Sequence, residues 1–214
     1  MRILLPNEHG AWGIFFTAFL LGWLGAPVLS WHPLWLLPAA LGAFLARYPL
    51  GLYFKKRRVT RALKIPLTRE KYWFAIYASF TAVTAAPLFY FFGWWWLLIF
   101  AGISGVVLGI HLRSLITRQE RSFFVEWTAM FGMASLAPAA SFAAAPVMGW
   151  NPITVWLMLV AFYTWRIRVV RRLVAARTTL PVDIRRVGTR ELNMSICFLI
   201  ASIIVLRIFY SGLF

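Results

Sequence analysis

The sequence is poor in acidic residues and in cysteine. Six of its 214 residues are acidic, and Asp183 is the only aspartate among them. Cys197 is the only cysteine, which excludes disulfide bonds within the chain and a metal site built from cysteines. Charged residues make up 13% of the chain, well below their share in soluble domains. These shortages exclude a disulfide-stabilised secreted fold and argue against a soluble globular protein.

Sequence motifs of common soluble enzymes are also missing. The chain has no glycine-rich phosphate loop, no Gly-x-Ser-x-Gly elbow and no His-Glu-x-x-His zinc motif. The sequence therefore predicts no metal site and indicates no particular cofactor, and it leaves open whether the protein is an enzyme.

Apolar and aromatic residues are abundant. Hydrophobic residues account for 62% of the chain and aromatic residues for 18%, with 12 tryptophans. Many of these rings lie near the ends of apolar runs, as expected for side chains that prefer the headgroup region of a bilayer. A net charge of +16 would suggest nucleic acid in a soluble protein. Because Lys and Arg lie between the apolar runs, we expect anionic lipid headgroups as their partners, and no nucleic acid.

Seven segments are long and apolar enough to span a membrane, which takes about 20 such residues. We predict an all-α membrane protein, a bundle of about seven transmembrane helices in a single polytopic domain over residues 1–214. The first span is expected to be retained, because Glu8 and His9 interrupt the pattern of a signal peptide. The predicted spans are about 11–30, 33–54, 72–92, 94–113, 122–144, 151–170 and 192–213.

The connections between the spans alternate in charge. Those near residues 30–33, 92–94 and 146–152 contain no Lys or Arg, whereas segments 55–71, 113–121 and 166–190 contain nearly all of them. Because basic loops stay in the cytoplasm, the N-terminus is predicted inside and the C-terminus outside.

Each basic connection contains a threonine followed closely by a glutamate. The pairs are Thr68 and Glu70, Thr117 and Glu120, and Thr189 and Glu191. Threonine is a good N-cap, and a carboxylate in the first turn is stabilised by the helix dipole. We therefore predict a capping role for these glutamates. The acids that remain unexplained are Glu8, Glu126 and Asp183.

Small residues spaced four apart predict where helices pack closely. These ladders are Ala18 and Gly22 in the first span, and Ala101, Gly105 and Gly109 in the fourth. Pro138 is expected to kink the fifth span, since proline removes a helix hydrogen bond. The sixth span is expected to continue past Trp165 as a basic amphipathic helix.

Ionisable residues within or beside the spans are costly and by default indicate a functional site. With the predicted topology, several of them lie at the inner ends of different helices and can line one cavity that faces the cytoplasm. The candidates for catalytic acid–base chemistry are Glu8, His9 and Glu126. The candidates for binding an anionic substrate are Arg47, Tyr48, Arg118 and Arg168, since guanidinium groups bind phosphate in a bidentate manner.

Each of these residues also has a structural interpretation or a second chemical one. Asn7 is alternatively the N-cap of the first span, with Glu8 in its first turn. Arg47 and Glu126 are alternatively a structural ion pair. Glu126, together with Glu8 and His9, is alternatively a metal site.

Two segments and one pair of residues in this chain resemble those of a known protein family. They are residues 6–12 (Pro-Asn-Glu-His-Gly-Ala-Trp), Arg47-Tyr48-Pro49-Leu50, and Arg118 with Glu126. On these residues the chain resembles the YwiC-like family of bacterial integral membrane proteins over essentially its whole length. That family is functionally uncharacterised, so the resemblance implies a topology, a bacterial inner (plasma) membrane and a site, but no reaction.

The chain is also distantly similar to UbiA-type intramembrane prenyltransferases, which are helical bundles with a cytoplasmic active site open to lipid. Those enzymes hold a diphosphate through magnesium on paired Asp-rich motifs. With Asp183 as its only aspartate, this chain departs from that pattern.

Three functions are consistent with these observations. The mixture of Arg, Glu and His on one leaflet favours a protein that binds or processes an anionic amphipathic lipid, such as an isoprenoid or a phospholipid. A small-solute or proton-coupled transporter is the first alternative, with His9 and Glu126 as titrating groups. A non-catalytic accessory subunit of a membrane complex is the second, because aromatic and small-residue surfaces can pack against partners.

Overall fold

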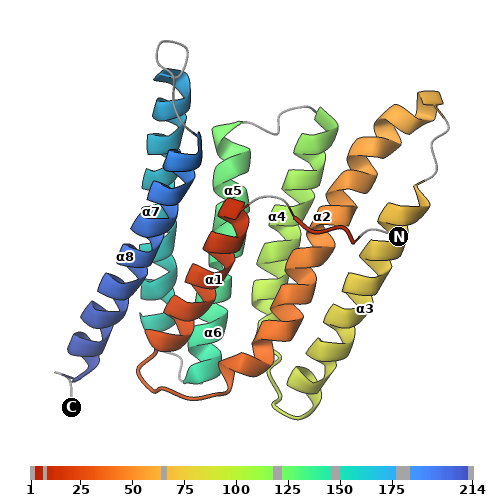
Figure 1. Cartoon of the computed structure of the whole chain (residues 1–214). Helices are drawn as coiled ribbons and strands as arrows, with labels where there is room; N and C mark the ends of the chain where they lie inside the picture. Colours follow the sequence, from red (N-terminus) through yellow and green to blue (C-terminus); the bar gives the residue numbers. More distant parts are fainter. Residues whose placement is uncertain are drawn as a thin grey trace. The chain divides into compact units, whose positions relative to one another are not determined.

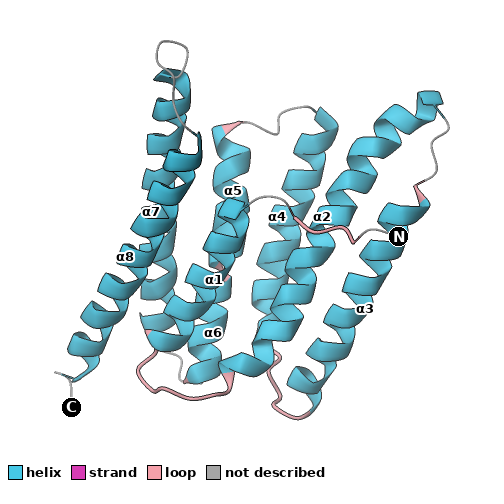
Figure 2. Cartoon of the chain, viewed as in Figure 1, coloured by secondary structure: helices cyan, strands magenta, loops and turns pink. Residues whose placement is uncertain are grey.

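The chain is helical throughout the parts that the structure, a computed structural model, describes. These parts are residues 3–6, 9–63, 67–117, 122–145, 150–176 and 184–211, and they contain no strand (Figure 2). The helices are α1 (His9–Leu24), α2 (Pro33–Leu63), α3 (Thr68–Tyr90), α4 (Leu97–Thr117), α5 (Phe123–Ala134), α6 (Leu136–Ala144), α7 (Trp150–Ala176) and α8 (Ile184–Ser211) (Figure 1). Because only Ser135 separates α5 from α6, these helices correspond to the seven predicted spans. The all-helical fold class is confirmed.

Five helical segments among the described residues are long and apolar enough to cross a membrane. They are Pro33–Arg57, Thr68–Tyr90, Leu97–Leu115, Asn151–Arg172 and Leu192–Tyr210. Gly10–Leu24 is a shorter apolar helix. The protein is therefore a multi-pass membrane protein, while the orientation of its termini stays a prediction.

The chain divides into two compact units. The first consists of Met1–Asn7 and Leu34–Ala129, and it contains α2, α3, α4 and the first turns of α5. The second consists of Glu8–Pro33 and Met130–Phe214, and it contains α1, the end of α5, α6, α7 and α8. The interpretation of residues 1–214 as a single polytopic domain stays a prediction.

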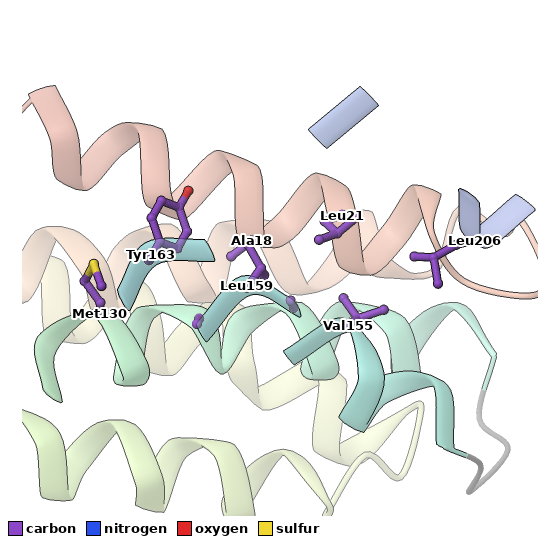
Figure 3. Packing of buried hydrophobic residues seen from close by; sticks show 9 residues of the cluster. Ala18, Leu21, Met130, Val155, Leu159, Tyr163 and Leu206 are labelled. Carbon is purple, nitrogen blue, oxygen red and sulfur yellow. The ribbon is translucent and has the colours of Figure 1, made fainter. Parts of the chain in front are cut away.

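The core of the second unit lies where α1 packs against α6, α7 and α8. Leu21, Val155 and Leu159 are fully buried there, and Figure 3 shows them facing one another from α1 and α7. At Gly22 an added Cβ would lie 2.8 Å from the carbonyl carbon of Ala137 on α6. The backbones of α1 and α6 therefore touch, as the ladder of Ala18 and Gly22 predicts.

In the first unit, α2 packs against α3 and reaches α4. A Cβ added at Gly42 of α2 would lie 2.5 Å from Thr81 Oγ1 on α3. A Cβ added at Gly51 would lie 3.5 Å from Leu115 Cδ1 on α4, which is an ordinary contact. The second predicted ladder behaves differently, because a Cβ at Gly105 or Gly109 has no neighbour within 4 Å. Within this unit the ladder on α4 is therefore not a packing contact, and the prediction is wrong there. Small residues show which face of a helix another helix can approach, but they do not determine that a helix lies against that face.

Proline explains two of the helix ends, that of α1 and that of α5. The first span was expected to reach residue 30, but α1 ends at Leu24. Pro27 lacks an N–H and disfavours helical backbone in the residue before it, so the helix ends in a turn in which the Gly25 N–H donates to the Leu21 carbonyl at 2.9 Å. Pro138 likewise leaves the carbonyl of Ala134 without its helix donor, and the break between α5 and α6 falls at that place.

The predicted threonine caps are wrong. Thr68 is the first residue of α3, and Leu67 occupies the N-cap position with no side-chain cap. Thr117 is the last residue of α4, and Thr189 lies within α8. Instead, Ser122 precedes α5, and its Oγ accepts a hydrogen bond from the Val125 N–H at 3.3 Å. The helices extend over the basic connections because Lys and Arg favour helix. Glu120 lies outside the described residues, as does the side chain of Glu191.

Candidate functional site

The predicted site residues are distributed over both units. Arg47 and Tyr48 lie on α2 and Glu126 lies on α5, all in the first unit. His9 begins α1, where its side chain is not described, and Arg168 is exposed on α7. Glu8 and Arg118 lie outside the described residues. That these side chains line one cavity stays a prediction.

Arg47 is the predicted residue whose surroundings are the most informative. It lies half-buried inside the apolar part of α2, ten residues before Arg57 at the end of the span Pro33–Arg57. Its guanidinium carbon is 5.6 Å from the centroid of the buried Phe44 ring, one helical turn away. A cation over a ring face is stabilised by the ring's quadrupole. The protein therefore accommodates an arginine within a membrane-spanning helix, which is a costly arrangement.

Glu126 occupies the first turn of α5. The Glu126 N–H donates to the Ser122 carbonyl at 3.1 Å, while the hydroxyl of Ser122 caps the helix at Val125. A carboxylate in this turn meets the positive end of the helix dipole. The sequence therefore places Glu126 at the N-terminal end of α5, where its side chain is half-buried.

A polar site that the sequence interpretation missed lies where the end of α2 approaches the start of α3. Lys56 Nζ donates to Glu70 Oε1 at 2.5 Å. The Glu70 side chain is only 2% exposed, whereas that of Lys56 is 48% exposed. Glu70 does occupy the first turn of α3, as predicted, but its main interaction is this ion pair. We call Lys56, Glu70 and Trp73 the Glu70 site.

Two polar atoms of the Glu70 site are buried and have no hydrogen-bond partner in the described part of the chain. They are Glu70 Oε2 and Trp73 Nε1. The two residues are three positions apart on α3, so they lie on one face of the helix. The Trp73 ring packs against Tyr77 with centroids 5.5 Å apart, and the Tyr77 hydroxyl donates to the Leu4 carbonyl at 3.1 Å. The indole is therefore held in place by Tyr77, while its N–H has no partner among the described residues.

The surroundings of the Glu70 site are basic. Lys55 and Arg57 flank Lys56 on exposed positions of α2, and Lys71 is exposed beside Glu70 on α3. Lys71 Nζ lies 5.8 Å from the centroid of the Tyr53 ring. The charge of Glu70 is already compensated by Lys56. The remaining basic residues therefore make the region where α2 ends and α3 begins positive. Among the described residues, no group of His, Cys, Asp and Glu could hold a metal ion.

In the second unit, Arg166 is the buried arginine of α7, whereas the predicted Arg168 is exposed. Arg166 Nη1 lies 2.9 Å from Met194 Sδ on α8, and its guanidinium carbon is 5.3 Å from the centroid of the Trp165 ring. Residues two positions apart on a helix lie on nearly opposite faces, so only one of these arginines can face α8. Sequence reasoning located the basic end of α7 but not its inward face.

Comparison with known proteins identifies the family to which the chain belongs. No solved structure matches the chain. A segment of 62 residues is 45% identical to the uncharacterized protein YwiC of Bacillus subtilis (strain 168), and the match covers 27% of this chain and 24% of that protein. The chain thus matches about a quarter of the length of this relative. The family model described as YwiC-like protein matches residues 5–141, which include Arg47, Glu70 and Glu126. The chain belongs to the YwiC-like protein family.

Proposed function

We propose that this membrane protein binds an anionic amphipathic lipid, an isoprenoid phosphate or a phospholipid, at a polar site that faces the cytoplasm. The observation that carries the proposal is Arg47, a half-buried arginine inside the apolar part of α2. The guanidinium carbon lies over the Phe44 ring, and a guanidinium group donates hydrogen bonds to phosphate oxygens in its own plane. An anionic headgroup is therefore a suitable ligand for Arg47.

The charge distribution along α2 supports this assignment. The exposed residues Lys55, Lys56 and Arg57 follow Arg47 within three helical turns. Basic residues at the end of a span attract anionic lipids, and they raise the local concentration of such lipids next to Arg47. A lipid that enters from the same leaflet can thus exchange its contacts with exposed lysines for contacts with Arg47.

In this proposal the predicted residues have separate roles. Arg118 and Arg168 join Arg47 in binding phosphate oxygens, and Tyr48 contributes a hydroxyl. Glu8, His9 and Glu126 are assigned to proton transfer in any reaction of the bound lipid, because the pKa of an imidazole is ordinarily close to neutral pH.

The test compares lipid that copurifies with wild-type protein and with Arg47→Gln in a mild detergent, quantified by mass spectrometry. We expect Arg47→Gln to retain roughly tenfold less anionic lipid, the effect of one lost charge-assisted hydrogen bond. Arg172→Gln is the matched control, because it removes one charge from an exposed position on α7. Equal losses in both variants would show a general effect of charge, and unchanged lipid in Arg47→Gln would contradict the proposal.

A further inference from the structure

We propose that the Glu70 site binds the headgroup of a phospholipid that carries hydroxyl groups beside its phosphate, that is, a glycerol-type headgroup. The proposal goes beyond the function given above, because Glu70 and Trp73 have no part in it, and Lys56 contributes there only to the general positive charge at the end of α2. It can hold even if Arg47 binds no lipid.

The hydrogen-bonding capacity of the site selects the headgroup. Glu70 Oε1 accepts from Lys56, while Glu70 Oε2 is a buried acceptor and Trp73 Nε1 a buried donor, both without a partner in the described part of the chain. Buried polar atoms in proteins are almost always hydrogen-bonded. Three residues along a helix rise about 4.5 Å and return to nearly the same face, so the two side chains start from neighbouring positions on the side of α3 that carries the Glu70 site. A hydroxyl group both donates and accepts, and two neighbouring hydroxyls satisfy a carboxylate oxygen and an indole N–H together.

The positive charges around the site favour a headgroup whose only charge is its phosphate. Lys55, Arg57 and Lys71 are exposed next to the Glu70 site, and the Glu70 carboxylate is paired with Lys56. A headgroup with a terminal ammonium would enter a positive field, whereas a headgroup whose only charge is its phosphate is attracted. This favours phosphatidylglycerol over phosphatidylethanolamine.

The position of the site along α3 fits a lipid. Tyr72 and Trp73 lie in the first two turns of the span Thr68–Tyr90, where aromatic side chains mark the headgroup region. Beyond them, exposed apolar residues continue along α3 at helical spacing, namely Ile76, Phe80 and Val83. Acyl chains can follow this stripe while the headgroup stays at the Glu70 site. Soluble glycerol phosphate has the same polar groups but cannot use the stripe, so we assign the site to the lipid.

The experiment measures binding of three lipids with matched acyl chains by native mass spectrometry of the full chain released from detergent. The lipids are phosphatidylglycerol, phosphatidic acid, which has the phosphate but not the glycerol hydroxyls, and phosphatidylethanolamine. We expect the wild-type protein to bind phosphatidylglycerol roughly fivefold more tightly than phosphatidic acid, as one ordinary hydrogen bond provides. Trp73→Phe keeps the ring and removes the N–H, so it should abolish this preference without weakening phosphatidic acid.

Two control variants show whether the preference depends on the Trp73 N–H itself. Trp95→Phe makes the same change at an exposed ring after α3, and it should keep the preference for phosphatidylglycerol. Arg47→Gln should lower the binding of all anionic lipids but leave the ratio of phosphatidylglycerol to phosphatidic acid unchanged. The two proposals can therefore fail separately. Glu70→Gln removes the charged acceptor and should also lower the ratio; if that variant does not fold, Trp73→Phe decides alone.

Several results would overturn the proposal. These are equal binding of phosphatidylglycerol and phosphatidic acid by the wild-type protein, tighter binding of phosphatidylethanolamine, and an unchanged ratio in Trp73→Phe. Displacement of the lipid by soluble sn-glycerol 3-phosphate at equal concentration would overturn the assignment to a lipid.

Discussion

Lys56 on α2 and Glu70 on α3 form an ion pair whose two members differ strongly in burial. Their atoms Nζ and Oε1 are 2.5 Å apart although the residues are separated by 14 positions in sequence. The Glu70 side chain is 2% exposed and that of Lys56 is 48% exposed. The carboxylate therefore depends on Lys56 for the compensation of its charge, while the ammonium group of Lys56 also has access to solvent.

Removing Lys56 is consequently expected to destabilise the fold. Lys56→Gln leaves a buried carboxylate without its hydrogen-bonded cation and with only the neighbouring charge of Arg69. We expect a loss of about 1–2 kcal/mol, because the exposure of Lys56 reduces the cost below that of a fully buried pair. The double variant Lys56→Gln with Glu70→Gln should recover about 1 kcal/mol relative to the sum of the single changes. Thermal unfolding in detergent measures all three. Lys55→Gln, at the exposed neighbouring position, should change stability little, and strict additivity of the two single changes would contradict the prediction.

The close approach of α1 and α6 at Gly22 gives a second prediction. In Gly22→Ala the new Cβ would lie 2.8 and 2.9 Å from the carbonyl carbon and the Cα of Ala137, and backbone atoms cannot rotate away. The helices must separate, so we expect a loss of about 2 kcal/mol in unfolding free energy. Gly13→Ala on the same helix has nothing within 4 Å and should stabilise by up to about 1 kcal/mol through helix propensity. Equal effects of the two substitutions would contradict the packing.

Several features of the fold are predictable from sequence because they depend on local covalent chemistry. Long apolar runs predict the helices, and the missing N–H of proline accounts for the end of α1 before Pro27 and for the break before Pro138. The threonine caps failed for a different reason. A capping pattern is short and recurs by chance, and it says nothing about how far the neighbouring basic residues extend a helix.

The site was harder to predict because burial depends on residues that are distant in sequence. Arg47 could be recognised as unusual, since any charge within an apolar run is costly. Glu70 looked like an ordinary first-turn carboxylate, because only the packing of α2 against α3 buries it beside Lys56. Similarly, the choice between Arg166 and Arg168 depends on which face of α7 meets α8, and the local sequence is basic on both faces.

Tyr77 connects α3 to the segment that leads into the predicted Glu8 and His9 motif. Its hydroxyl donates to the buried Leu4 carbonyl at 3.1 Å. In Tyr77→Phe this carbonyl loses its donor, at a cost of about 1 kcal/mol, and we expect faster hydrogen exchange of the amides of residues 3–5. Hydrogen–deuterium exchange of the N-terminal peptide, read by mass spectrometry, measures this. Tyr72→Phe, whose ring is 52% exposed, is the control, and identical exchange in both variants would argue against the role of Tyr77.

The predicted orientation determines which leaflet supplies lipid to the Glu70 site, and single cysteines can test it. Cys197, the only cysteine, lies in the span Leu192–Tyr210 and is first replaced by alanine. Trp31 is 74% exposed between α1 and α2, and Arg57 is exposed near the other end of α2. Since basic ends stay in the cytoplasm, a membrane-impermeant maleimide should label Trp31→Cys in intact cells but label Arg57→Cys only after permeabilisation. The opposite pattern would place Lys56, Glu70 and Trp73 at the outer leaflet.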